Sequence, residues 1–314
     1  MDGAQLTIVM YHYVRPLEQT RYPEIKGLRV SEFRAQLAHI RRHYQPVTVR
    51  DVAYCLRCGQ RLPPNAILLT FDDGYLDHYT YVFPLLHEAH IQGAFFPPVN
   101  PVRNGQLLDV NRIHFILASV ENKQALVEGI NRSLSDYGPA YGLKTAEQYW
   151  AEWGKASRFD TAQVMYIKYM LQVALPEAIR TEITERLFHR FVTSDEVAFA
   201  REVYMDTDQL RMMQRCDMYI GSHGVTHRWL NSLSPQAQRE EIEGSLAFLR
   251  EVGSPTADYW VMCYPYGASD ESLRDLLKEY HCALGLTTQV GVADLERNDA
   301  LLLPRRDTND LPKQ

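Results

Sequence analysis

The sequence predicts an α/β protein built on a mostly parallel, barrel-like sheet, and three observations support this prediction. Short apolar runs typical of strands alternate along the chain with segments of helical period. Polar motifs directly follow several of these runs, as in barrels that carry their chemistry at the carboxyl ends of the strands. With 314 residues, 46% of them hydrophobic, the chain is long enough for one large core. We therefore expect a single domain over residues 1–314.

The expected elements follow from apolar runs for strands and from 3.6-residue periodicity for helices. The first helical segment shows this period through Phe33, Leu37 and Ile40, with Ser31 as the expected N-cap. Strands are predicted at 6–13, 45–49, 66–71, 92–97, 217–222, 259–265, 281–287 and 301–303. Helices are predicted at 31–44, 77–90, 234–252 and 270–280.

The most informative motif is Thr70-Phe71-Asp72-Asp73-Gly74, which places two adjacent carboxylates where an apolar run ends. The glycine allows a sharp turn at that point. Such a pair either begins a turn by hydrogen bonding to the backbone or holds a metal ion. The motif alone leaves both interpretations open.

Two histidines four positions apart, His223 and His227, follow another strand-like run at Met218–Ile220. On a helical turn this spacing places both imidazoles on one face, so they can reach one metal ion, with a carboxylate completing the site. The alternative is a pair of surface or core histidines, because the chain has eleven. Two polar clusters at two strand ends favour one shared rim.

A third strand-like run, Tyr259–Tyr264, breaks into Pro265-Tyr266-Gly267. The series TFDDG, SHxxTH and YPYG, in this order, resembles the polysaccharide deacetylase family of carbohydrate esterases. The resemblance covers roughly residues 6–99 and 217–306. It implies a distorted (β/α)7 barrel that forms a single catalytic domain.

The resemblance also implies a role for each motif residue. Asp73, His223 and His227 would bind one divalent metal, Asp72 would be the catalytic base, and a backbone N–H near Tyr266 would share the oxyanion charge. Two histidines and one carboxylate suit a hydrolytic zinc site, and non-haem iron uses the same ligands. Zinc is the first choice, with iron, cobalt or nickel as alternatives.

The chain departs from the family pattern at its general acid. Many members carry a C-terminal Leu-x-His motif, and none follows Gly267. We expect His12, at the end of the first strand, to be the acid, because the opening segment resembles the permuted branch that includes poly-N-acetylglucosamine deacetylases. The alternative is a histidine that only caps a strand.

Two further departures concern residues around the expected metal and base. Cys263 stands where many members carry the arginine of an RxPY motif, which orients the base. Arg305 or Arg306, after an apolar run, could supply that charge, and Arg305 is our expectation. Gly224 stands where a Ser or Thr commonly follows the first metal histidine. The chain therefore lacks one hydroxyl that would support the metal ligands.

Residues 101–213 form long helix-forming stretches between the Asp-Asp and HxxxH motifs, where most family members need far fewer residues. We predict a mainly helical insertion near the active site. Its aromatic residues are expected to form its own core, with stacking on sugar rings as the alternative. His114, near its start, could reach the substrate. The aromatic residues are Tyr137, Tyr141, Tyr149, Trp150, Trp153, Tyr166 and Tyr169.

Composition limits the possible partners and compartment. Five scattered cysteines suggest no disulfide framework, and Cys55-Leu56-Arg57-Cys58 is interpreted as a helix end before Gly59 rather than a metal or redox motif. The absence of a signal-like or membrane-spanning segment predicts a cytoplasmic protein without membrane insertion. A net charge of −6 argues against nucleic acid.

The resulting hypothesis is a metal-dependent hydrolase that removes an N-acyl group, with acetyl as the first choice, from an amino sugar. A cytoplasmic location favours a nucleotide-linked, lipid-linked or small intermediate of cell-surface polysaccharide biosynthesis. One alternative is hydrolysis of another linear or cyclic amide, such as a formamide, on the same metal. Another is a non-catalytic sugar-binding protein. The oligomeric state is left open.

Overall fold

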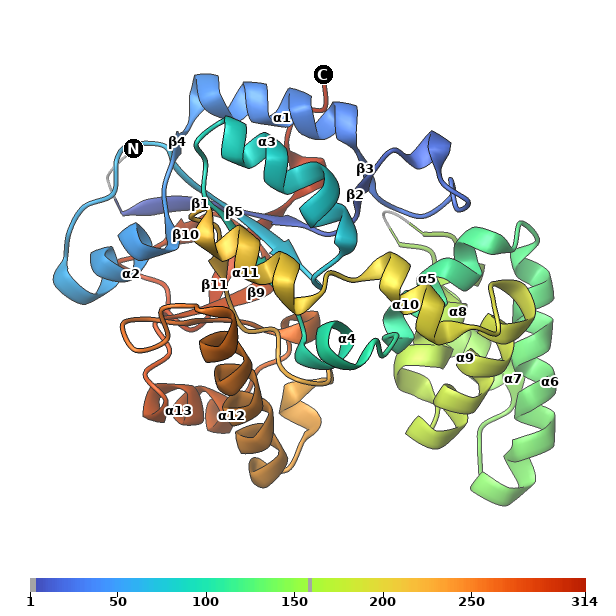
Figure 1. The fold of residues 1–314 in the computed structure, drawn as a ribbon. Coiled ribbons are helices and arrows are strands. Elements are labelled where there is room, and N and C mark those ends of the chain that lie inside the picture. Colours follow the sequence, from blue (N-terminus) through green and yellow to red (C-terminus); the bar gives the residue numbers. More distant parts are fainter. Residues whose placement is uncertain (1–3, 158–159) are drawn as a thin grey trace. The chain divides into compact units, whose positions relative to one another are not determined.

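The computed structural model describes residues 4–157 and 160–314 and divides into two compact units (Figure 1). We call them the barrel unit and the helical unit and describe each separately. The barrel unit comprises residues up to Pro16, 27–106 and 200–314, and the helical unit comprises 17–26 and 107–199.

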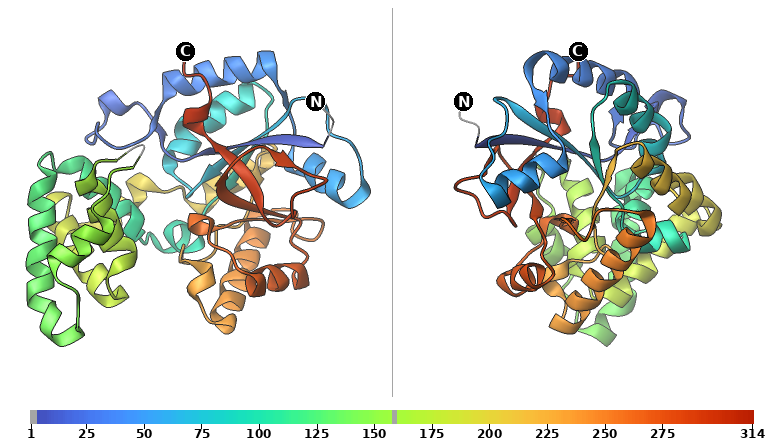
Figure 2. Two further views of the ribbon diagram at one scale, coloured as in Figure 1. Left: turned by 180° about the vertical axis from the view of Figure 1, so that it is seen from behind. Right: turned by 60° about the vertical axis from the view of Figure 1, so that its left-hand side comes forward.

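The barrel unit is built on a curled parallel sheet in the order β7-β6-β5-β1-β11-β9-β8 (Figure 2). Its two ends meet after β7, where the Ser222 N–H donates to the Val261 carbonyl (2.9 Å) and the Cys263 N–H donates to the Ser222 carbonyl (2.8 Å). The predicted distorted (β/α)7 barrel is confirmed. The strands are β1 (Gln5–Tyr11), β5 (Ala66–Asp72), β6 (Gly93–Phe96), β7 (Tyr219–Ile220), β8 (Val261–Cys263), β9 (Leu284–Val290) and β11 (Leu303–Asp307).

Strand β5 shows how the sequence positions the site. All seven of its residues are buried, as in parallel strands that are covered on both faces. Leu69 and Phe71 pack into one hydrophobic cluster, whereas Leu68 packs into another. Because side chains alternate along a strand, Thr70 and Asp72 continue the Leu68 series. The Asp72 carboxylate is thereby directed to the face on which Leu68 lies.

Helices of the barrel unit begin with side-chain caps at several positions. Ser234 and Asp270 accept hydrogen bonds from the first turns of α12 and α13. The prediction of Ser31 as an N-cap is wrong, because the Glu32 side chain accepts from the Arg29 N–H (2.9 Å) and α1 begins one residue before Ser31. The helices are α1 (Val30–His43), α2 (Val49–Cys58), η2 (His78–Val82), α3 (Phe83–Glu88), α4 (Val99–Asn104), α11 (Thr207–Arg215), η4 (Leu230–Ser232), α12 (Pro235–Val252), η5 (Pro265–Gly267), α13 (Glu271–Glu279) and η6 (Thr308–Asp310).

Short strands complete the barrel unit. β2 (Val14–Arg15) and β3 (Leu28–Arg29) form a separate pair. β4 (Gln45–Pro46) pairs with β5, and β10 (Ala293–Asp294) pairs with β1.

The helical unit has its own core, in which Tyr149 and Tyr166 are buried, while Tyr141 and Trp150 are exposed. The expectation that its aromatic residues form a core therefore holds for part of the set. Whether this insertion lies near the active site stays a prediction. The elements are η1 (Leu17–Gln19), α5 (Asp109–Ser119), α6 (Lys123–Tyr141), α7 (Ala146–Trp153), α8 (Ala162–Tyr169), η3 (Met170–Ala174), α9 (Glu177–Phe191) and α10 (Glu196–Val203), whose end belongs to the barrel unit.

The cysteines and the helix lengths bear on two other expectations. Helix α2 ends at Cys58, and Gly59 follows with φ 67°, which confirms the interpretation of the CxxC segment as a helix end. All five cysteines are free thiols. Within residues 4–157 and 160–314, no helix is long and apolar enough to cross a membrane.

Candidate active site

Asp73, His223 and His227 come together just beyond the carboxyl ends of β5 and β7. Asp73 Oδ1 lies 3.3 Å from His223 Nε2 and 3.2 Å from His227 Nε2, and all three side chains are buried. Burial raises the pKa of the Asp73 carboxyl, but its contacts with the two imidazoles outweigh this effect and hold the pKa well below its usual range. One carboxylate and two imidazoles therefore face one another.

Neighbouring groups orient these three side chains. The Tyr75 hydroxyl donates to Asp73 Oδ2 (2.6 Å), and His223 Nδ1 donates to the Cys263 carbonyl (2.7 Å). A histidine that donates through Nδ1 keeps the lone pair of Nε2 available to a metal. Burial lowers the pKa of His227, which favours the neutral imidazole that a metal requires. Burial acts in the same direction on His223, but contacts with Cys263 and Asp73 outweigh it and raise the pKa of His223, so a bound metal would have to displace that proton. The donor set therefore fits a divalent metal ion.

A second trio, Asp72, His223 and Cys263, also has its ligand atoms within 4.8 Å of one another. Both Asp72 oxygens already accept hydrogen bonds from Arg305. Burial raises the pKa of the Cys263 thiol, whereas a metal requires the thiolate. The trio of Asp73, His223 and His227 is therefore the better metal site.

The two histidines do not lie on a helical turn, so that part of the prediction is wrong. Gly224 has φ 72° and His227 has φ 57°, both in the left-handed region that interrupts a right-handed helix. The segment between β7 and η4 is a loop. The imidazoles nevertheless meet, with ring centroids 4.8 Å apart.

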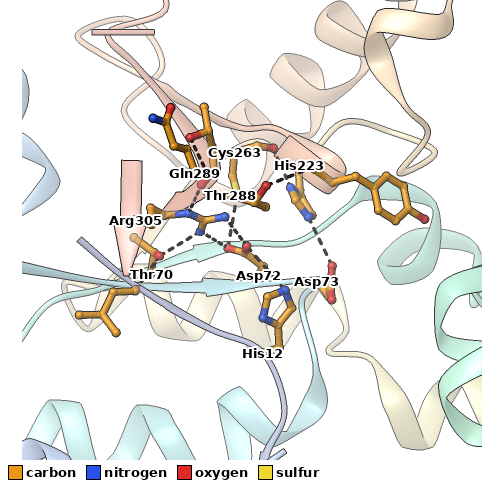
Figure 3. A network of polar contacts seen from close by, with 12 residues as sticks. His12, Thr70, Asp72, Asp73, His223, Cys263, Thr288, Gln289 and Arg305 are labelled. Carbon is orange, nitrogen blue, oxygen red and sulfur yellow. Dashed lines mark hydrogen bonds and ion pairs between the residues drawn. The ribbon is translucent and has the colours of Figure 1, made fainter. Parts of the chain in front are cut away.

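Asp72 is held by Arg305 from β11 (Figure 3). Arg305 donates from Nη1 to Oδ1 (2.8 Å) and from Nη2 to Oδ2 (2.7 Å), a bidentate ion pair with both side chains buried. Burial raises the pKa of Asp72, but the guanidinium overcomes it and lowers the pKa to about 2. Arg305 thus pairs with Asp72, whereas Arg306 is only half-buried, and the role of Arg305 in place of the missing motif arginine stays a prediction.

His12 follows β1 and lies beside the base. Its Nε2 is 3.9 Å from Asp72 Oδ2, and 43% of its side chain is exposed, compared with 3% for Asp72. The His12 carbonyl accepts a hydrogen bond from His78 Nε2 (2.8 Å) on η2, which anchors its backbone. The structure therefore places a solvent-accessible imidazole next to a buried carboxylate.

Tyr266 lies in η5, directly after β8, with φ 59°. Its ring packs edge-on against His227 (4.8 Å between centroids) and stacks on Trp229 (4.6 Å). The residue therefore adjoins the metal-binding trio, and the role of its backbone N–H stays a prediction. His114 lies on α5 of the helical unit.

Four supporting residues were not found from the sequence. Cys263 was noted only as a missing arginine, yet its thiol donates to Asp72 Oδ1 (3.4 Å). Tyr75 and His78 lie a few residues after the Asp pair, but neither is part of a recognisable sequence motif. Glu241 lies on α12, 14 positions after His227, and only the fold brings it to the loop that joins the two histidines.

Comparisons with known proteins match a segment of this chain and its overall fold. A family model described as "Polysaccharide deacetylase" matches residues 188–284, which include His223 and His227. A segment of 74 residues is 47% identical to the poly-beta-1,6-N-acetyl-D-glucosamine N-deacetylase of Escherichia coli (strain K12). The segment is 23% of this chain and only 11% of the length of that relative.

Solved structures share the fold over nearly the whole chain. The Streptococcus pyogenes deacetylase PplD, in complex with acetate, has a TM-score of 0.56 at 16% identity, covering 96% of this chain and 92% of that one. IcaB from Ammonifex degensii has a TM-score of 0.54 at 18% identity, covering 96% and 91%. Residues 188–284 thus resemble the polysaccharide deacetylase family, and nearly the whole chain shares the fold of these solved structures.

Proposed function

We propose that this protein is a hydrolase that removes the N-acetyl group from an amino sugar within a saccharide. The observation that carries the proposal is the adjacency of a metal-binding trio to a buried, ionised carboxylate at the carboxyl ends of barrel strands. The match of residues 188–284 to the polysaccharide deacetylase family model supports the same reaction class. The activity named for the Escherichia coli relative suggests N-acetylglucosamine as the sugar.

Asp73, His223 and His227 would hold one divalent metal ion. Zinc is the first choice, because two imidazoles and a carboxylate with open positions suit hydrolytic zinc, and iron, cobalt or nickel are the alternatives. Such an ion, when bound, lowers the pKa of water and polarises the scissile carbonyl. The burial of all three side chains excludes bulk water from them and strengthens their charge interactions.

Asp72 would be the general base. Its carboxylate stays ionised at neutral pH, because Arg305 holds its pKa at about 2. A carboxylate has about four lone-pair sites, and Arg305 and Cys263 use two on Oδ1 and one on Oδ2. The site that is left is on Oδ2, the oxygen 3.9 Å from His12 Nε2. A water proton would be accepted there.

His12 would be the general acid that protonates the departing amine. Its exposure gives it access to substrate and solvent, and its Nε2 lies 3.9 Å from Asp72 Oδ2. The backbone N–H of Tyr266 would donate to the oxyanion, in accordance with its position beside His227. The cytoplasmic location and the carrier of the sugar stay predictions.

The experiment that tests this proposal measures metal content and product release on protein purified without chelators. We expect the purified protein to contain near-stoichiometric metal and to release acetate from β-1,6-linked N-acetylglucosamine oligomers. Acetate and formate release are then compared on matched N-acetyl and N-formyl substrates. The Asp72→Asn variant should keep the metal and lose the activity. Preferential formate release would favour the formamide alternative, and a protein that binds sugar without metal or hydrolysis would contradict the proposal.

A further inference from the structure

The loop from Gly224 to Thr226 joins the two histidines of the metal-binding trio. Because it is not helical, the 3.6-residue period does not set the separation of the imidazoles. His227 itself has φ 57°, a conformation that is strained for a non-glycine residue unless surrounding contacts hold it. Some neighbouring group must therefore maintain this loop.

Glu241 of α12 contacts the N–H side of this loop, whereas the N–H groups of Val99 and Asn100 on α4 donate to the Gly224 and Val225 carbonyls. Glu241 Oε2 accepts hydrogen bonds from the backbone N–H groups of Val225 (2.6 Å) and Thr226 (3.1 Å), and its Oε1 accepts one from the Thr226 hydroxyl. The residue is 6% exposed. Among the described residues, no basic side chain forms an ion pair with it. The loop itself therefore supplies the donors that compensate this buried carboxylate.

Gly224 matches this arrangement in two ways. Its φ of 72° is readily adopted by glycine and rarely by other residues. A Cβ atom at this position would lie 2.8 Å from Glu241 Oε2. The glycine that replaces the usual Ser or Thr of the family thus makes room for the carboxylate that holds the loop.

Helix α12 also contacts the other side of His223. The hydroxyls of Ser222 and Ser245 are hydrogen-bonded at 2.8 Å, and both side chains are buried. Ser245 lies one turn after Glu241 on α12. One face of this helix therefore holds the chain both before and after the first histidine.

We propose that Glu241 is a positioning residue that holds His223 and His227 in the arrangement that binds the metal, and that Gly224 is its steric partner. This inference rests on the proposed metal site. Supporting residues around metal ligands typically contribute 10- to 100-fold to metal affinity. Glu241 would act in the same way through the backbone of the loop rather than through a ring nitrogen.

The test compares Glu241→Gln with Glu240→Gln, a matched change at the preceding residue of the same helix, which is exposed. Zinc affinity is measured by competition with a chromophoric chelator, and folding by circular dichroism. We expect Glu241→Gln to weaken zinc binding by about 10- to 100-fold, with Glu240→Gln unchanged. In the metal-free protein, hydrogen exchange at the Val225 and Thr226 amides should accelerate in Glu241→Gln.

The outcomes separate this inference from the proposed function. Failure of the wild type to bind zinc, cobalt or nickel would overturn the proposed metal site and this inference with it. Equal zinc affinity and equal amide exchange in wild type and Glu241→Gln would overturn the inference alone. If Glu241→Gln does not fold, Thr226→Val removes one of the three donors and should weaken zinc binding by a smaller factor, and unchanged affinity would again overturn it.

A double-mutant cycle tests the steric pairing of Gly224 with Glu241. Gly224→Ala should weaken zinc binding in the wild type, because its Cβ displaces the carboxylate. The same change should have a smaller effect in a Glu241→Ala background, where the carboxylate is gone. Additive effects of the two changes would show that the residues act independently and would contradict this part of the inference.

Discussion

The barrel unit and the helical unit differ in where their backbones adopt uncommon conformations. In the barrel unit, three non-glycine residues of the candidate site have positive φ: Asp73 (71°), His227 (57°) and Tyr266 (59°). Among the described residues of the helical unit, only Gly142 does, and it ends α6. Backbone strain concentrates where surrounding contacts and function require it. Four further non-glycine residues of the barrel unit, outside this site, also have positive φ, so the contrast distinguishes the two units but does not by itself locate the chemistry.

The two units also use paired carboxylates differently. Asp72 is held by a fully buried arginine, whereas Asp160 of the helical unit accepts from Lys168 (2.8 Å) and from Lys26 (2.5 Å), whose side chain is 61% exposed. Burial raises the pKa of Asp160, but the two lysines outweigh it and lower the pKa. The first pair fixes a reactive group in position, and the second only joins elements of a helical core.

The largest effect is expected at the metal-binding trio. Asp73→Ala removes one of three ligands and should reduce acetate release by roughly 10³-fold or more, because bound metal contributes several kcal/mol to transition-state stabilisation. Elemental analysis should show lost metal. Asp258→Asn, an exposed aspartate of the same unit, is the control. If Asp73→Ala keeps its metal, Asp73 is not a ligand, and the trio no longer distinguishes the barrel unit from the helical unit.

Removal of the arginine that holds the base comes next. Arg305→Met leaves the buried Asp72 carboxylate without its partner and should destabilise the protein by about 3 to 5 kcal/mol, measured by denaturant unfolding. Arg306→Met, at the neighbouring half-buried position, is the matched control. Similar losses in both variants would show that this ion pair has no special contribution.

His12→Gln should lower kcat for N-acetyl substrates by about 10²-fold, the lower range for a general acid. The same variant should hydrolyse an aryl acetate ester nearly as fast as the wild type, because a phenolate leaves without protonation. His43→Gln, an exposed histidine on α1, is the control. An equal loss on both substrates would assign His12 to another step.

The smallest effect is expected in the helical unit. Asp160→Asn should cost about 1 kcal/mol of unfolding free energy, since one of its partners is well exposed. The pKa of Asp160 is lower in the folded state, so this contribution is present above the ordinary aspartate pKa and is lost as the pH falls below it. Calorimetric scans at several pH values should show a shallower acid slope in the variant. An unchanged slope would contradict the pairing.

The sequence predicted those parts of the fold that depend on local pattern. The mostly apolar β5 run and the approximate ends of β5, β7 and β8 were visible as composition. Local pattern failed in two places, one decided by a capping contact three positions apart and the other by a contact 16 positions apart. Glu32 moved the start of α1, and Glu241 holds a loop that the HxxxH spacing alone suggested to be helical. Arg305 was reached only by family resemblance, because its partner lies 233 positions away.

The position of β1 in the sheet has a consequence for how the protein is made. Its neighbours are β5 and β11, so the first strand of the chain pairs with one of the last. During synthesis, Asp72 leaves the ribosome long before Arg305, and an unpaired carboxylate cannot be buried cheaply. Closure of the barrel around the base therefore waits until β11 is available. Formation of the Asp72–Arg305 ion pair and completion of the barrel would then be one event.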